Sequence, residues 1–201
     1  MRRICIMGGT FDPIHFGHLV VAEEVRCRFA LEKVVFIPTG KPPHKKNQRI
    51  TDPLDRLKMV QLATADNEFF EVSRLEIDRQ GYSYTIDTVR AVKALYNAEK
   101  VYFITGADAA LEIFTWKDVD ELLTICTFIA ATRPGFNLNR LEESLKSLPN
   151  NISKNIIPLE VPALSISSTD IRQRVKEGRS IKYLLPASVE NYIWQNNLYT
   201  K

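Results

Sequence analysis

The sequence has only three cysteines and three histidines in 201 residues, and it lacks a hydrophobic run long enough to cross a membrane. The cysteines are far apart, odd in number and set in apolar stretches, which is typical of reduced core thiols and argues against a disulfide framework or a zinc cluster. The apolar run after the first two arginines is too short for a signal peptide. We therefore expect a cytoplasmic protein with no membrane partner.

Charge of one sign is also scarce, because 27 lysines and arginines face 24 acidic residues and leave a formal net charge of +3. This small excess gives no bulk field that would favour nucleic acid, so any preference for anions must be local. The 45% hydrophobic content is ample for one core. We expect a single domain over residues 1–201, with residues 166–201 as a C-terminal helical portion.

Short runs with strand character alternate along the chain with helical patterns. The runs cover residues 3–7, 33–38, 68–73, 100–105, 124–131 and 156–161. Continuous apolar strands between amphipathic helices predict an α/β fold, namely a Rossmann-like, doubly wound and mostly parallel sheet with helices on both faces.

Helix boundaries can be read from capping residues. Asp52 and Pro53 predict a helix over residues 53–64. A second helix is expected behind Ser83 or Thr85, a third runs from Ser167 or Ser168 to Gly178, and a short one lies within residues 186–199. The proline-rich, basic residues 39–53 are expected to form a loop.

An open α/β sheet binds its ligand beyond the carboxyl ends of its strands. Four polar segments follow predicted strands: GGTFDPIHFGH (8–18), TGKPPHKK (39–46), TGADAALEIFTW (105–116) and LSISSTDIR (164–172). These segments are therefore where we expect the chemistry.

The first of these segments predicts an anion site. Gly8 and Gly9 allow a sharp turn and a close ligand approach, and the helix that begins near Phe16 presents free amides that favour phosphate. His15 and His18 fall on one side of this helix at its N-terminal end, so both imidazoles should reach one ligand at the mouth of the crevice. A neighbouring triphosphate should favour their charged form.

The third histidine, His44, lies beside lysines that include Lys41 in a loop suited to cover a polyphosphate. Each histidine alone is compatible with a packing or capping role, but all three in two strand-exit loops favour function. A zinc site from Asp12, His15 and His18 lacks the usual spacing and a cysteine partner. The glycine spacing matches neither the dinucleotide fingerprint nor a P-loop.

GGTFDPIHFGH resembles the first signature of nucleotidyltransferases, [HT]-x-G-H, and SISSTDIR resembles their second, I-S-S-T-x-I-R. With TGKPPHK, GYSYTIDTV, TGADAALEIFTW and TRPGF in the expected order, essentially the whole chain resembles bacterial nicotinate mononucleotide adenylyltransferases. The resemblance implies transfer of the adenylyl group of ATP to nicotinate mononucleotide. The implied products are nicotinate adenine dinucleotide and pyrophosphate, and the implied cofactor is Mg²⁺ carried on the ATP phosphates.

The resemblance also implies roles for individual residues. His18 is assigned to the α-phosphate, His15 to the triphosphate, and Arg172 with Ser168 and Thr169 to the departing phosphates, so that residues 166–201 complete the ATP site. The other implied nucleotide contacts are Gly8, Gly9, Thr10, Gly106 and Asp108.

For the acceptor, the resemblance points to Thr85, Trp116 and Arg133 around the nicotinate ring and to Lys41 and His44 on its phosphate. Trp116 would stack on the ring, with a core anchor as its alternative role, and Arg133 would favour the carboxylate over an amide. Members of the family often carry an aromatic residue after this tryptophan, whereas this chain has Lys117.

Other functions remain open from the sequence alone. The same fold and first motif would serve an adenylyltransferase for nicotinamide mononucleotide or phosphopantetheine, or a cytidylyltransferase. A non-catalytic nucleotide sensor or RNA-binding module would use the basic loop, but that loop lacks interleaved aromatics, so no nucleic-acid partner is expected. The sequence is compatible with a homo-oligomer and does not set its size.

Overall fold

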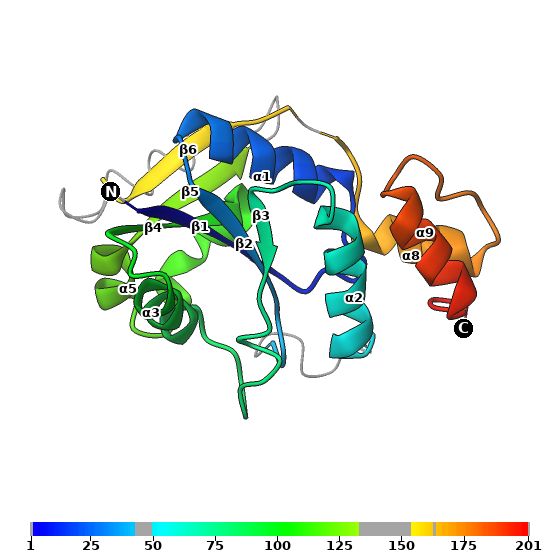
Figure 1. Ribbon diagram of the computed structural model, residues 1–201, viewed down its shortest axis with the longest axis horizontal. Coiled ribbons are helices and arrows are strands. Elements are labelled where there is room, and N and C mark those ends of the chain that lie inside the picture. Colours follow the sequence, from blue (N-terminus) through cyan, green and yellow to red (C-terminus); the bar gives the residue numbers. More distant parts are fainter. Residues whose placement is uncertain (1, 43–49, 133–153, 163, 201) are drawn as a thin grey trace.

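The computed structural model describes residues 2–42, 50–132, 154–162 and 164–200, with the side chains at 107 and 108 also outside the description (Figure 1). Its centre is a sheet in the order β3-β2-β1-β4-β5-β6, with every neighbouring pair parallel. The strands are β1 (Arg3–Gly9), β2 (Lys33–Pro38), β3 (Phe70–Val72), β4 (Lys100–Gly106), β5 (Cys126–Thr132) and β6 (Ile156–Glu160). This is the doubly wound, Rossmann-like order, in which the chain changes direction across the sheet between β1 and β4.

The helices cover both faces of the sheet, with α1 on one face and α3 and α5 on the other (Figure 1). Their bounds are α1 (Phe16–Arg28), α2 (Pro53–Thr64), α3 (Thr85–Leu95), α4 (Ala107–Leu111), the 3-10 helix η2 (Ile113–Thr115), α5 (Val119–Ile125), α8 (Ser168–Lys176) and α9 (Ala187–Gln195). The predicted fold class is confirmed.

Two apolar layers follow from the alternation of side chains along each strand. In β1, Cys5 and Met7 belong to the cluster that includes buried residues of α1, α2, α8 and α9, while Ile4 and Ile6 belong to the cluster that includes those of α3 and α5. Ile171 of α8 and Val189 of α9 are fully buried in the first of these clusters. The C-terminal helices therefore share one core with the central sheet.

Several predicted boundaries match the structure. The helix over 53–64 is confirmed, with the Asp52 carboxylate accepting from the amide of Leu54 at 2.8 Å. For α8, Ser167 is the capping residue and accepts from the amide of Asp170. The predicted caps of α3 are wrong: Tyr84 occupies the N-cap without a side-chain cap bond, because Thr85 is already the first helical residue.

Two further expectations need correction. The strand predicted over 124–131 begins only at Cys126, since α5 runs directly into β5 and the continuous apolar run offers no turn signal between them. The expectation of core thiols holds for Cys5 and Cys126, but Cys27 is exposed. It lies two residues beyond the buried Val25 on α1, and residues at that spacing face different sides of a helix.

Among the described residues, no helix is long and apolar enough to cross a membrane.

Candidate active site

A cavity of about 970 Å³ opens at the carboxyl ends of the central strands. Its walls include Gly8–Thr10 at the exit of β1, Thr39 after β2, Thr105 and Gly106 of β4, and Ser168 of α8. The cavity therefore lies at the point where the strand order reverses, which is where doubly wound sheets bind ligands.

Paired imidazoles stand at the start of α1 in this cavity. His15 is the N-cap of α1 and His18 its third residue, and their rings stack with centroids 3.8 Å apart. The backbone amide of His15 donates to Nδ1 of His18 across 3.2 Å. Both rings line the cavity, as the three-residue spacing predicts.

The hydrogen bond to His18 fixes which nitrogen carries its proton. Burial, with a smaller effect of His15, lowers the pKa of His18 to about 3, so the ring is neutral near pH 7. A neutral imidazole has one donor and one acceptor, and Nδ1 is here the acceptor. His18 therefore presents Nε2–H as a donor before any ligand adds its charge.

Aromatic rings lie close to the two glycines at the end of β1. A Cβ at Gly8 would lie 3.0 Å from the Phe103 ring, and one at Gly9 would lie 3.0 Å from the ring of Phe11. Phe11 itself has a φ of 50°, in the left-handed region, and its buried ring meets His18 edge-on at 5.1 Å. Aromatic packing thus sets the backbone path and the imidazole position together.

The start of α8 is tied to the opening loop. Ser168 Oγ donates to the carbonyl of Pro13 at 2.8 Å, and Arg172 donates from one Nη to the carbonyl of Asp12 at 2.7 Å. The other Nη of Arg172 donates to Thr169 at 3.3 Å. Ser168 lines the cavity, whereas Thr169 and Arg172, also in α8, are not among the residues that line it.

The side chains predicted for the acceptor are only partly brought together. Thr85 and Trp116 line one wall of the cavity, where Trp116 meets the rings of Phe103 at 6.2 Å and Phe128 at 5.9 Å. Trp116 therefore lines the cavity and also packs on the core. Lys41 is exposed, with Nζ 5.1 Å from the ring of Tyr82, and does not line the cavity.

Three predicted residues fall wholly or partly outside the described part of the chain. His44 and Arg133 lie outside it altogether, and Asp108 belongs to α4 but its side chain is not described. Gly106 lines the cavity as the N-cap of α4.

Sequence reasoning missed a buried arginine beneath the site. Arg56 of α2 is fully buried and donates to the carbonyls of Thr10 at 2.7 Å, Thr39 at 2.7 Å and Thr51 at 2.9 Å. It therefore joins the loops that leave β1 and β2. Its position within a predicted amphipathic helix gave no signal, because a helical arginine is most often at the surface.

Asp12 has a structural role at the same place. Its carboxylate accepts from the phenol of Tyr199 at 2.8 Å and from the amide of Thr51 at 3.4 Å. Among the described residues, no group of three or more His, Cys, Asp or Glu side chains could hold a metal ion.

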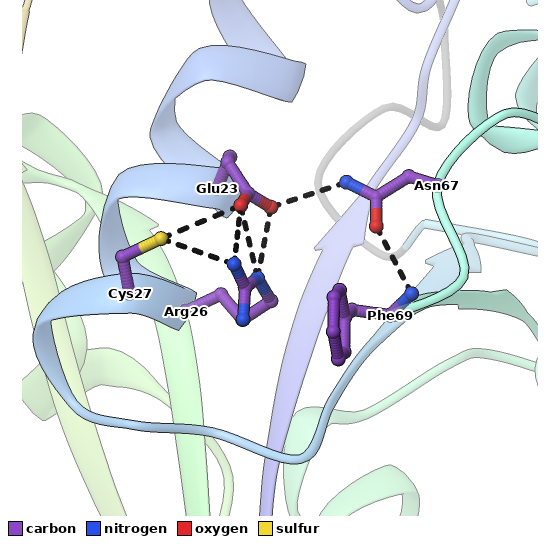
Figure 2. Close-up of polar contacts among 5 residues, drawn as sticks. All are labelled: Glu23, Arg26, Cys27, Asn67 and Phe69. Atoms are coloured by element: carbon purple, nitrogen blue, oxygen red, sulfur yellow. Dashed lines mark hydrogen bonds and ion pairs between the residues drawn. The ribbon is translucent and has the colours of Figure 1, made fainter.

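The exposed Cys27 belongs to a polar cluster away from the cavity (Figure 2). Glu23 accepts from Arg26, Asn67 and the Cys27 thiol, and the Arg26 guanidinium lies 4.1 Å from the centroid of the Phe69 ring. The neighbouring carboxylate raises the pKa of Cys27, and the hydrogen bond from Arg26 is the main cause that lowers the pKa of Glu23 to about 2. The cluster pins α1 to the turn before β3 and leaves Cys27 a poor nucleophile.

Comparison with known proteins agrees with this geometry. The model of the cytidylyltransferase-like family matches residues 6–174. The chain belongs to that family. A relative from Moorella thermoacetica, named probable nicotinate-nucleotide adenylyltransferase, is 63% identical over 98% of this chain and 91% of its own length. One from Thermoanaerobacter sp. with the same name is 58% identical over 99% of this chain and 95% of its own.

The fold also matches a solved structure. Nicotinic acid mononucleotide adenylyltransferase of Plasmodium falciparum, complexed with NaAD, has a TM-score of 0.80 and covers 99% of this chain and 98% of its own, at 24% identity. At that identity the likeness concerns the fold.

Proposed function

We propose that this protein transfers the adenylyl group of ATP to nicotinate mononucleotide, giving nicotinate adenine dinucleotide and pyrophosphate. The observation that carries the proposal is the stacked His15–His18 pair at the start of α1, with Nε2–H of His18 as the donor in the cavity. The relatives of 58% and 63% identity, each named for this activity, support it.

The reaction needs no side-chain nucleophile. The phosphate oxygen of the acceptor, already ionised near pH 7, attacks the α-phosphorus of ATP, and the bond to the bridging oxygen of pyrophosphate breaks with its electron pair. Catalysis then depends on positioning and on donors to the oxygens that gain charge. His18 would donate to the α-phosphate, and His15 with the amides at the start of α1 would hold the triphosphate.

The remaining nucleotide contacts form part of the proposal. Gly8, Gly9 and Thr10 would contact the nucleotide through their backbone, and Gly106 with Asp108 would lie near its ribose. Ser168, Thr169 and Arg172 would receive the departing phosphates. For Ser168 and Arg172 this requires exchanging the carbonyls of Pro13 and Asp12 for phosphate oxygens.

The acceptor is proposed to lie along the Thr85–Trp116 wall, with Trp116 stacked on the pyridine and Arg133 favouring its carboxylate. Lys41 and His44 would contact the acceptor phosphate. The shared core of the sheet and C-terminal helices supports a single domain in which residues 166–201 complete the ATP site. The proposal includes a cytoplasmic location, supported by the free cysteines.

Magnesium enters the proposal with ATP. The described residues offer the ion no cluster of protein ligands, so the ATP phosphates and water would hold it. When bound, Mg²⁺ supplies positive charge to the phosphates. The chain itself supplies the histidines, the helix amides and the arginine.

The test is pyrophosphate release from ATP and Mg²⁺ with nicotinate mononucleotide, nicotinamide mononucleotide or phosphopantetheine as acceptor. We expect kcat/KM for the nicotinate nucleotide to exceed both others by at least about tenfold. A preference for either other acceptor would overturn the substrate assignment. Absence of pyrophosphate with all three would overturn catalysis and favour a nucleotide sensor.

A further inference from the structure

Lys117 lines the cavity at the wall proposed for the acceptor. Among the described lining residues, Lys117 is the one lysine or arginine, whereas Glu76 and Glu112 are the acidic ones. Glu76 is buried and accepts from the hydroxyl of Thr88 at 2.7 Å, and burial raises the pKa of its carboxyl. Among the described lining residues, Lys117 is therefore the side chain that offers a full positive charge to a bound anion.

Two residues set the position of Lys117: Tyr84, which is the N-cap of α3, and Asp87 within α3. Its Nζ lies 4.7 Å from the centroid of the Tyr84 ring and 3.9 Å from an oxygen of Asp87. Asp87 is shared with Arg90, 3.6 Å away, which also pairs with Glu121. Because Asp87 also pairs with Arg90, it does not fully neutralise the Lys117 ammonium, and positive charge remains for a ligand.

Lys117 also adjoins the residues that would hold the ring. It follows Trp116 in the chain, and Tyr84 beneath its ammonium precedes Thr85. All four residues line the cavity. In the proposed function, the phosphate of the acceptor lies near His18, where it attacks the α-phosphate of ATP. The pyridine is at the other end of the mononucleotide, so the negative group near Lys117 would be a carboxylate on the ring.

We propose that Lys117 is a specificity-determining residue that recognises the negative charge of a pyridine carboxylate, an inference that rests on the proposed function. The Tyr84 ring and the Asp87 carboxylate position its ammonium. The recognition adds to that assigned to Arg133.

The effect should be modest, because the Lys117 side chain is 47% exposed and water screens its charge. We expect Lys117→Met to lower the ratio of kcat/KM for nicotinate over nicotinamide mononucleotide by about fivefold. The loss should fall on KM for the acid, with kcat for both acceptors nearly unchanged. Lys117→Arg should keep the ratio.

A matched control lies outside the cavity. Lys182 is exposed and its Nζ lies 5.5 Å from the Tyr183 ring, so Lys182→Met removes a similar cation–ring contact without touching the cavity wall. It should leave the ratio unchanged. Added salt should lower the wild-type ratio more than that of Lys117→Met, in which only the recognition assigned to Arg133 remains to be screened.

The outcomes separate the two proposals. An acid preference that is equal in wild type and Lys117→Met, or an equal loss for both acceptors, would overturn the role of Lys117 and leave the proposed function standing. Wild-type protein that turns over neither pyridine nucleotide would overturn the proposed function, and the role of Lys117 with it.

Discussion

The phenol of Tyr199 donates to the carboxylate of Asp12 across 2.8 Å, joining residues 187 positions apart in the chain. Asp12 lies in the loop that carries the histidine pair, and its backbone carbonyl is held by Arg172. The last residues of the chain therefore stabilise the first motif, and burial together with Asp12 raises the pKa of Tyr199.

Tyr199→Phe should lower the free energy of unfolding by about 2 kcal/mol, because a buried carboxylate loses a hydrogen-bond donor. It should also raise KM for ATP severalfold, since the opening loop loses an anchor. Urea denaturation and steady-state kinetics measure the two effects. Tyr183→Phe, at a side chain that is 80% exposed, is the control and should change neither. If Tyr199→Phe kept the wild-type free energy of unfolding and KM for ATP, the contact would have neither of these roles.

Arg56→Met should lower the free energy of unfolding by about 3 kcal/mol or more, because three backbone carbonyls lose the charged donor that a fully buried side chain supplies. The same variant should loosen the exits of β1 and β2 and lower kcat/KM for both substrates. Arg90→Met, at an exposed ion pair with Glu121, is the comparison and should leave the unfolding midpoint nearly unchanged. Equal midpoints for the two variants would contradict the structural role of Arg56.

Gly40→Ala should be strongly destabilising, because a Cβ there would lie 2.1 Å from the backbone oxygen of Glu76, and backbone cannot give way cheaply. We expect a loss of about 2 kcal/mol or more in the free energy of unfolding. Gly106→Ala offers a matched comparison, since its Cβ would meet nothing within 4 Å. Thermal unfolding of both variants provides the measurement, and similar Tm values would contradict the close packing at Gly40.

The stability of the protein should fall as the pH is lowered below about 6.5. His18 has a folded-state pKa of about 3, below the ordinary value of 6.5, so the unfolded chain binds more protons between these values. Its contribution to stability is present above pH 6.5 and is lost as the pH falls towards 3. Between pH 6.5 and 5 the loss amounts to about 2 kcal/mol for one fully shifted group.

His18→Gln should reduce this pH dependence, because glutamine does not titrate. Urea denaturation of wild type and variant at several pH values between 5 and 7.5 measures the difference. Identical slopes in the two proteins would show that His18 is not a buried neutral group.

The sequence predicts the sheet and the position of the site well, for physical reasons that particular residues illustrate. Buried strands of a parallel sheet read as apolar runs, and Asp52–Pro53 marks a helix start by local capping alone. The two histidines fall together because three residues nearly complete a turn. Strand exits then locate the cavity, since parallel strands end at one edge.

What the sequence does not reveal are contacts between distant segments. Arg56 donates to the carbonyls of Thr10 and Thr39, and Tyr199 donates to the carboxylate of Asp12. Neither pairing has a local signature in the sequence. The neutral state of His18 also depends on burial by residues such as Phe11, which adopts a backbone conformation that its type rarely shows. The ammonium of Lys117 is placed by α3, some thirty residues earlier in the chain.

The central claim is that Nε2–H of His18 stabilises the charge that develops during adenylyl transfer. The most direct measurement compares kcat for pyrophosphate release by wild type, His18→Ala, His18→Asn and His18→Gln, with circular dichroism to confirm folding. A glutamine amide can reach the place of Nε2 and an asparagine amide that of Nδ1. We expect losses of about 10²-fold to 10³-fold for alanine and asparagine and a smaller loss for glutamine. Folded His18→Ala with near wild-type kcat would contradict the account.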